Sequence, residues 1–381
     1  MMFESRVNLH KQRTARILTA ACGLLFSAFS IVYLYLFQKD LLEAMHYTLA
    51  QGKTEYSPLG TALVITLVLL LMRWGVNALL GLKGIVRELS YFPSFLVLGV
   101  ITDVDYSIYQ EGFSDKWMWL LPLLLIVYFV GMFMLRRLFR GLFDVASDGG
   151  RIVTCNLTIF LLLCFMTTGI GNTNIHFHHG LAVESALRRA SYSEARQVGY
   201  LVMDPSRSLT ALRAYAMSKE GTLGEHLFEY PQYYGAEGLL IDADEVLRVT
   251  PDSLYTYLGD RPREGESAMR FFQRICNEET GNHTTLEYYL SALLLEKQLG
   301  KFYESFHTLY TPGDNLPHYY KEALFLYEKL HPDVEPTLQD ETLEQEWSRY
   351  QASKEELAGS IGEGNFMRRI HGNTYWWYYQ Y

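Results

Sequence analysis

The chain has only four cysteines in 381 residues, and it lacks the common catalytic signatures. Cys22, Cys155 and Cys164 lie in long apolar runs, which leaves Cys276 alone in the second half. A lone thiol excludes an internal disulfide framework there, and no Cys/His spacing suits zinc. The sequence contains no GxSxG, HExxH, phosphate-binding loop or GxGxxG pattern. Neither a catalytic activity nor a cofactor is therefore predicted from motifs.

Basic residues are scarce in the second half. Residues 171–381 contain 19 Lys and Arg against 31 Asp and Glu, a net charge of −12, whereas residues 1–170 carry +3. Nucleic acids are bound largely through Lys and Arg that neutralise phosphates, so nucleic acid is not an expected partner. Aromatic residues are plentiful instead, 28 of them tyrosine, as is typical of membrane interfaces and helix packing.

Charged residues are nearly absent from five long apolar runs in the first 170 residues. The last run, residues 152–170, has no charged side chain. About 20 residues at 1.5 Å each match a hydrocarbon core of about 30 Å. The predicted spans are residues 17–37, 59–80, 87–104, 117–135 and 152–170. The third is short and contains Pro93, so a re-entrant segment is the alternative. The first exceeds a signal-peptide core and no A-x-A site follows it, which favours an uncleaved signal-anchor over a secretory signal.

The positive charges predict the orientation of these spans. With five spans and a cytoplasmic N-terminus, eleven Lys and Arg lie on the inner side and three on the outer side, as the positive-inside rule requires. Without the third span, the RRLFR cluster at 136–140 would lie outside. Arg73 is close enough to the inner helix end to snorkel, and spans with so little charge argue against a transporter. The inner set is Arg6, Lys11, Arg13, Arg16, Arg73, Lys83, Arg87, Arg136, Arg137, Arg140 and Arg151, and the outer set is Lys39, Lys53 and Lys116.

The second half predicts amphipathic helices in pairs. In residues 286–312, Ala292 lies eight residues before Gly300, followed by Phe302 and the closing Pro312. Small residues at a helix crossing, an aromatic after the turn and a final proline resemble the tetratricopeptide pattern of about 34 residues. The resemblance covers residues 181–231 and 284–332, and it implies an α-helical repeat surface rather than an activity.

The whole layout is similar to that of uncharacterised membrane proteins of the gut Bacteroidota, through the five spans, the helical exterior domain and the ending GNTYWWYYQY. This resemblance implies a Gram-negative inner membrane and a periplasmic C-terminal domain, and no known function. We therefore expect an all-α membrane protein with a five-helix transmembrane bundle (1–170). A helical repeat-like domain (171–337) follows, and then a charged helix with an aromatic tail (338–381).

Three polar clusters are candidate sites. Asp103 and Asp105, beside Tyr106, lie at the outer end of the third span, where membrane glycosyltransferases that use lipid-linked donors place acidic pairs as base or metal ligand. The alternative is that both acids cap a span where the chain enters water. His176, His178 and His179 could bind a metal, or they have a structural or solvent-facing role. Residues 241–245 (IDADE) lack the glycine and final glutamate of a calcium loop, so a surface turn is expected.

The last seven residues include six aromatic rings, which we expect to leave water because burying each large ring contributes about 1.5–3 kcal/mol. They could pack into their own domain, lie among lipid headgroups or dock on a partner. The rings are Tyr375, Trp376, Trp377, Tyr378, Tyr379 and Tyr381. The expected function is a non-enzymatic scaffold or adaptor that contacts membrane lipid and binds another envelope protein. The alternatives are an enzyme acting on a lipid or lipid-linked glycan through Asp103 and Asp105, and an accessory subunit of a transport or secretion complex.

Overall fold

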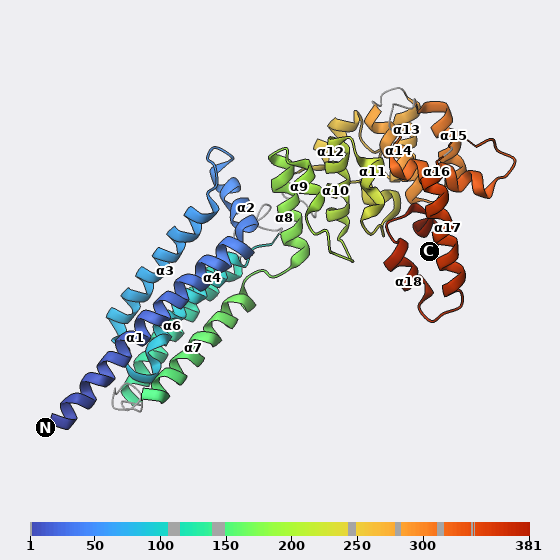
Figure 1. Cartoon of the computed structure of the whole chain (residues 1–381). Helices are drawn as coiled ribbons and strands as arrows, with labels where there is room; N and C mark the ends of the chain where they lie inside the picture. The colour runs from blue at the N-terminus through green and yellow to red at the C-terminus, as the bar shows by residue number, and fades with distance from the viewer. Residues whose placement is uncertain are drawn as a thin grey trace. The chain divides into compact units, whose positions relative to one another are not determined.

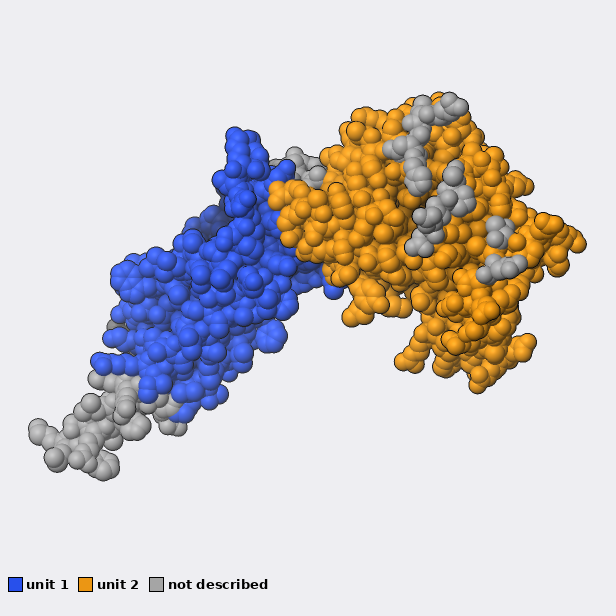
Figure 2. All heavy atoms as spheres, turned by 45° about the horizontal axis from the view of Figure 1, so that its top comes forward, with its two compact units in different colours: residues 1–178 blue, residues 179–381 orange. Residues whose placement is uncertain are grey.

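The computed structural model describes residues 2–105, 115–138, 149–242, 249–278, 283–310, 316–336, 338 and 340–381. Within these ranges the chain forms helices joined by turns and loops, with no strand, and the predicted all-α class is confirmed (Figure 1). Tyr106 and most of the IDADE motif lie outside the described residues. The chain divides into two compact units, residues 1–178 and 179–381 (Figure 2).

Unit 1 contains five helices that are long and apolar enough to cross a membrane. These candidate spans are Arg16–Phe37, Pro58–Leu80, Gly84–Thr102, Lys116–Leu138 and Gly150–Ile170. The helices of unit 1 are α1 (Met2–Val32), the π-helix η1 (Tyr33–Phe37), α2 (Lys39–Ala50), α3 (Pro58–Leu80), the 3₁₀ helix η2 (Gly84–Tyr91), α4 (Phe92–Thr102), α6 (Asp115–Leu138) and α7 (Gly149–Ile170). Local sequence sets their ends: the Ser57 hydroxyl accepts a hydrogen bond from the Gly60 amide at the start of α3, and Gly81 ends that helix with a positive φ.

The third candidate span, the shortest, is the most deeply packed. It runs from η2 into α4, and 61% of its residues are buried, against 11–33% in the other four. Hydroxyl groups join it to its neighbours: Ser94 donates to the Leu69 carbonyl (2.8 Å) and Thr167 donates to the Phe95 carbonyl (3.0 Å). Such hydrogen bonds and small residues replace the hydrophobic effect as the force between helices in lipid.

Two charged residues, the partly buried Arg73 and the buried Glu88, also pack in this region. The Arg73 side chain donates from Nε to the Ser90 hydroxyl (3.2 Å) and lies 4.7 Å from the centre of the Tyr91 ring. Arg73 therefore contacts the third candidate span near its start. Glu88 is fully buried, and its amide donates to Asn156 Oδ1 (3.1 Å). No pattern in the sequence marks this carboxyl group as buried.

Unit 2 is a helical domain around one core. Helix α10 lies at its centre, with every residue from Ser208 to Ser218 buried. The Ser206 hydroxyl caps its start and Gly221 ends it with a φ of +73°. The helices are α8 (Ile175–Arg188, which begins in unit 1), α9 (Tyr192–Gln197), α10 (Arg207–Glu220), α11 (Leu223–His226), η4 (Leu227–Glu229), η5 (Gly235–Leu239), α12 (Pro251–Leu258), α13 (Ala268–Asn277), α14 (His283–Leu295), α15 (Leu299–Leu309), α16 (His318–Leu330), α17 (Glu341–Leu357), α18 (Glu363–His371) and α19 (Tyr375–Gln380).

The aromatic tail packs within unit 2. Tyr375 and Trp376 are buried in the core. The Trp376 indole N–H donates to the Glu322 carbonyl (3.1 Å), and its ring lies edge-on to Trp347 at 5.3 Å. Of the three destinations considered for the tail, these two rings take the first, packing into their own domain, so they are not available as partner or lipid contacts. The tail's remaining rings are half-buried, namely Trp377, Tyr378 and Tyr379, or exposed, namely Tyr381.

A buried carboxylate holds the tail in place. Glu322 Oε2 accepts a hydrogen bond from the Tyr375 amide (2.6 Å), and Oε1 lies 3.2 Å from His318 Nε2. The hydrogen bond to Glu322 raises the pKa of His318 above its ordinary value of 6.5, and burial raises the pKa of Glu322. Glu225 and Glu346 also face His318. As the pH rises, the folded His318–Glu322 pair thus keeps the His318 proton after the unfolded chain has released it.

This pair predicts that unit 2 loses stability as the pH rises above 6.5. Below that pH the folded and unfolded chains both hold the His318 proton, so the stabilisation is fully present; above it the unfolded chain releases the proton first, and the stabilisation is lost as the pH passes the raised pKa of the folded state. The thermal unfolding midpoint of the full chain in a non-ionic detergent should fall between pH 6.5 and pH 8.5. The His318→Gln variant should change little over this range, and an equal fall in both proteins would contradict the assignment.

Candidate functional site

The Asp103 side chain makes contacts between two helix ends. Its Oδ2 accepts a hydrogen bond from the Trp117 indole (2.6 Å) and forms an ion pair with Lys116 Nζ (2.7 Å). This contact joins the end of α4 to the start of α6. Asp105 is exposed. These contacts of Asp103 are those of a carboxylate that fixes a helix junction.

The three histidines after α7 are not brought together around a metal. Among the described residues there is no group of three His, Cys, Asp or Glu side chains placed to hold an ion. His178 Nε2 lies 2.9 Å from the Asn172 carbonyl. The His179 ring packs against Gly199, where an added Cβ would approach it to 3.1 Å. His176 is partly buried.

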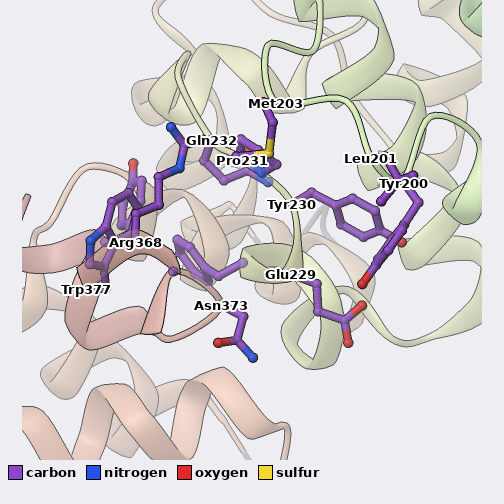
Figure 3. Close-up of a pocket in the computed structure, with 13 residues that line it drawn as sticks. Tyr200, Leu201, Met203, Glu229, Tyr230, Pro231, Gln232, Arg368, Asn373 and Trp377 are labelled. Carbon is purple, nitrogen blue, oxygen red and sulfur yellow. The ribbon is translucent and has the colours of Figure 1, made fainter. Parts of the chain in front are cut away.

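Unit 2 contains a pocket of about 250 Å³ that sequence reasoning did not predict. Three segments line it, as Figure 3 shows. One is the loop after α9, another is the stretch Phe228–Gln232, and the third is the α18–α19 region. The first contributes Tyr200, Leu201 and Met203, and the third contributes Arg368, Trp377 and Tyr378 among others. Aromatic and apolar side chains dominate this lining, as in most ligand sites of proteins.

A buried arginine holds the loop after α9 in place. Arg213, which is only 2% exposed, donates to the carbonyls of Arg196 (3.1 Å) and Val198 (2.7 Å). Its guanidinium lies 4.1 Å from the centre of the Tyr230 ring. Burial lowers the pKa of Arg213 to about 10, so the group stays charged at neutral pH. Because the loop carbonyls are bound on the inside, Arg213 fixes the backbone that carries the rim of the pocket.

The rim side chains of this loop point to solvent. Tyr200, Leu201 and Met203 are 61%, 84% and 60% exposed, although all three are large and apolar. Tyr200 lies edge-on to the buried Tyr230 ring at 6.1 Å. An exposed apolar cluster beside a pocket is typical of an interaction site rather than of ordinary surface.

The opposite wall is tied to this loop through Tyr233. The Tyr233 hydroxyl donates to the Met203 carbonyl (2.8 Å) and accepts from Arg368 Nη2 (2.6 Å). The Arg368 guanidinium lies 5.7 Å from the ring centres of both Tyr233 and Trp377. Phe228 is buried beneath, 4.8 Å from the Tyr378 ring. The guanidinium of Arg368 thus contacts two rings.

The two charged residues of the lining have different surroundings. Glu229 accepts from His226 Nδ1 (2.8 Å) and from Arg196 Nη1 (3.2 Å), so its charge is compensated within the fold. Arg368 forms no ion pair with any carboxylate of the described residues, and it contacts Tyr233 and Trp377 instead. The uncompensated charge at this pocket is therefore positive, although unit 2 as a whole is acidic.

One sequence signal could have indicated the pocket. The apolar run Tyr200–Met203 directly precedes Asp204-Pro205, and it forms an exposed loop because α9 ends at Gln197. Nothing in the sequence distinguishes Arg368 from its neighbour Arg369, because the direction of each side chain depends on how α18 packs.

Residues 257–381 match the sequence model of a family of unknown function, DUF6057. The match includes the pocket wall formed by α18 and α19 and excludes the loop after α9. No curated protein and no solved structure matches the chain.

Proposed function

We propose that this chain is a membrane-anchored adaptor whose unit 2 binds a segment of another protein through the pocket between the loop after α9 and helices α18 and α19. The observation that carries the proposal is the exposed apolar rim of Tyr200, Leu201 and Met203 beside an aromatic-lined pocket. Large aromatic and apolar groups that surround a pocket are the usual anchoring points of protein interfaces.

The anchored arrangement agrees with the charges along the chain. The eleven inner and three outer Lys and Arg support a cytoplasmic N-terminus and a unit 2 outside the cytoplasm. We place the five apolar helices in an inner membrane and unit 2 in the periplasm. The partner would then be another envelope protein, such as a subunit of a transport or secretion complex. The paired helices α14, α15 and α16 would supply a tetratricopeptide-like scaffold beside the pocket.

An enzyme acting on a lipid-linked glycan is the less favoured function. Such an enzyme would need a carboxylate ready to accept a proton or bind a metal. Oδ2 of Asp103 is already bound by Lys116 and Trp117. If the chain is an adaptor, these contacts of Asp103 have a structural role. The adaptor function also accounts for the exposed apolar rim and the pocket of unit 2, which an enzyme acting through Asp103 does not explain.

Site-specific photo-crosslinking in the native host tests the adaptor. A photoreactive residue at Leu201, on the pocket rim, should yield one dominant cross-linked protein. A residue at Leu330, which is also exposed but does not line the pocket, should not yield it. The Leu201 product should disappear when Trp377→Ala removes one wall. Equal products from both positions, or a Leu201 product that persists in the Trp377→Ala variant, would overturn the proposal, as would no product at all.

A further inference from the structure

We infer that the pocket of unit 2 selects protein segments in which an Asp or Glu side chain lies next to an aromatic or large apolar residue, and that Arg368 binds the carboxylate. This inference rests on the proposed adaptor function and specifies its partner. It is based on the lack of a carboxylate partner for Arg368, on the compensated charge of Glu229 and on the size and lining of the pocket.

Arg368 is positioned to receive an anion. The two rings at 5.7 Å, of Tyr233 and Trp377, hold the guanidinium, and one nitrogen donates to the Tyr233 hydroxyl. A guanidinium has five N–H donors, so this contact uses one of them. A carboxylate is the group that matches the remaining donors best, because it can accept two parallel hydrogen bonds.

Two other arginines of unit 2 are paired with carboxylates, and a third is bound by the backbone. Arg274 is bound by Glu266 (2.8 Å) and by Asp260, and Arg207 lies 3.6 Å from Glu237. Arg213 is bound by backbone carbonyls. Arg368 differs from Arg274 and Arg207 in having no carboxylate partner among the described residues, and from Arg213 in lying at the pocket. It is the one Lys, Arg or His among the described residues that line the pocket.

The acid in the lining does not oppose an anionic ligand. Glu229 is bound by His226 and Arg196. The net charge at the pocket is therefore that of Arg368. Salt screens the acidic surface farther away over about 8–10 Å, so this surface repels a carboxylate at the pocket less than Arg368 attracts it at close range.

The size and rim of the pocket favour an internal segment of a protein. About 250 Å³ is below the roughly 300–1,000 Å³ of sites for drug-sized ligands, and it suits one or two side chains. Exposed apolar groups lie on the rim, among them Leu201 and Met203. A chain that crosses the pocket can bury its apolar side chain against the rings and place a neighbouring carboxylate on Arg368. The side-chain amide of Asn373 lies in the lining and can bind its backbone, whereas Nε2 of Gln232 already donates to the Leu227 carbonyl (2.7 Å).

Peptide selection followed by a double-mutant cycle tests this inference. The full chain in lipid nanodiscs is used to select from a library of random nine-residue peptides displayed by mRNA, whose C-termini are linked and carry no free carboxylate. The selected peptides should share an Asp or Glu beside an aromatic or large apolar residue. The strongest peptide, fluorescein-labelled and amidated, is then titrated by fluorescence anisotropy.

The expected result is specific to Arg368. The Arg368→Gln variant should bind at least tenfold more weakly, whereas Arg369→Gln, the same change on the adjacent exposed residue, should bind within twofold of the wild type. Replacing the peptide's acid by its amide should weaken binding to the wild type tenfold and leave binding to Arg368→Gln unchanged. Retention of partial affinity by Arg368→Lys would show that the variant pocket is folded.

Other outcomes separate this inference from the adaptor itself. Peptides without an acid, or an acid whose loss weakens both proteins equally, would overturn the role of Arg368 while leaving an apolar adaptor site that Trp377→Ala still impairs. Binding only by peptides with a free C-terminus, from a second library, would overturn the side chain as the source of the carboxylate. If neither library yields a peptide that depends on the pocket, the adaptor and the inference both fail.

Discussion

Replacement of Trp376 by alanine should destabilise unit 2 by about 3–5 kcal/mol, the range found when a buried aromatic side chain is truncated to alanine. The Trp376 ring is 2% exposed and packs against Phe325 and Trp347. Its removal would leave a cavity between α16, α17 and the tail, and the Glu322 carbonyl would lose its indole donor. The loss should appear as a lower thermal midpoint of the full chain, followed by near-ultraviolet circular dichroism in detergent.

The adjacent tryptophan provides a matched control. Trp377 is only half-buried, so the Trp377→Ala variant should lose about 1–2 kcal/mol at most. Equal losses in the two variants would show that the tail is not anchored through Trp376. A truncation after Gly372 is a poor test of partner binding, because it removes the buried Tyr375 and Trp376 together with the pocket residue Trp377.

The tail also shows how far sequence reasoning reaches. Six rings in seven residues predict burial, because apolar area is driven out of water wherever the chain offers a surface. The surface itself was not predictable: it depends on Glu322, 53 positions before Tyr375, which is buried with its carboxylate on the Tyr375 amide. A glutamate in an amphipathic helix is normally solvent-exposed, so no local pattern marks Glu322 as the residue that receives the tail.

The membrane half was more predictable for a physical reason. A span needs about 20 apolar residues, and this requirement can be read directly from the sequence. How deeply each span is buried among the others cannot be read from the sequence in the same way. The short segment with Pro93 was the least certain span from its sequence, yet α4 lies at the centre of unit 1. Its small and hydroxylated residues, including Ser94 and Gly99, permit close approach, and their partners lie on other helices.

Gly99 therefore supplies the second large prediction. A Cβ built at this position lies 3.0 Å from the Ile170 Cβ and 3.4 Å from the Thr167 carbonyl oxygen. Gly99→Leu adds three more carbons at the same crossing of α4 and α7, so one helix must move away from the other. Overpacking of a filled core typically costs about 1–3 kcal/mol. Here it also strains the hydrogen bond from the Thr167 hydroxyl to the Phe95 carbonyl. We expect at least the upper end of that range.

The measurement is the temperature at which half of the detergent-solubilised chain remains monodisperse on size-exclusion chromatography. Gly169→Leu is the matched control, because Gly169 is on α7 and a Cβ there meets no atom within 4 Å. Gly99→Leu should lower the midpoint strongly, Gly99→Ala by less, and Gly169→Leu hardly at all. If Gly99→Leu and Gly169→Leu behave alike, the close crossing of α4 and α7 does not exist. In that case the central place of the third span in unit 1 would be wrong, since this crossing is one of the contacts that bury it.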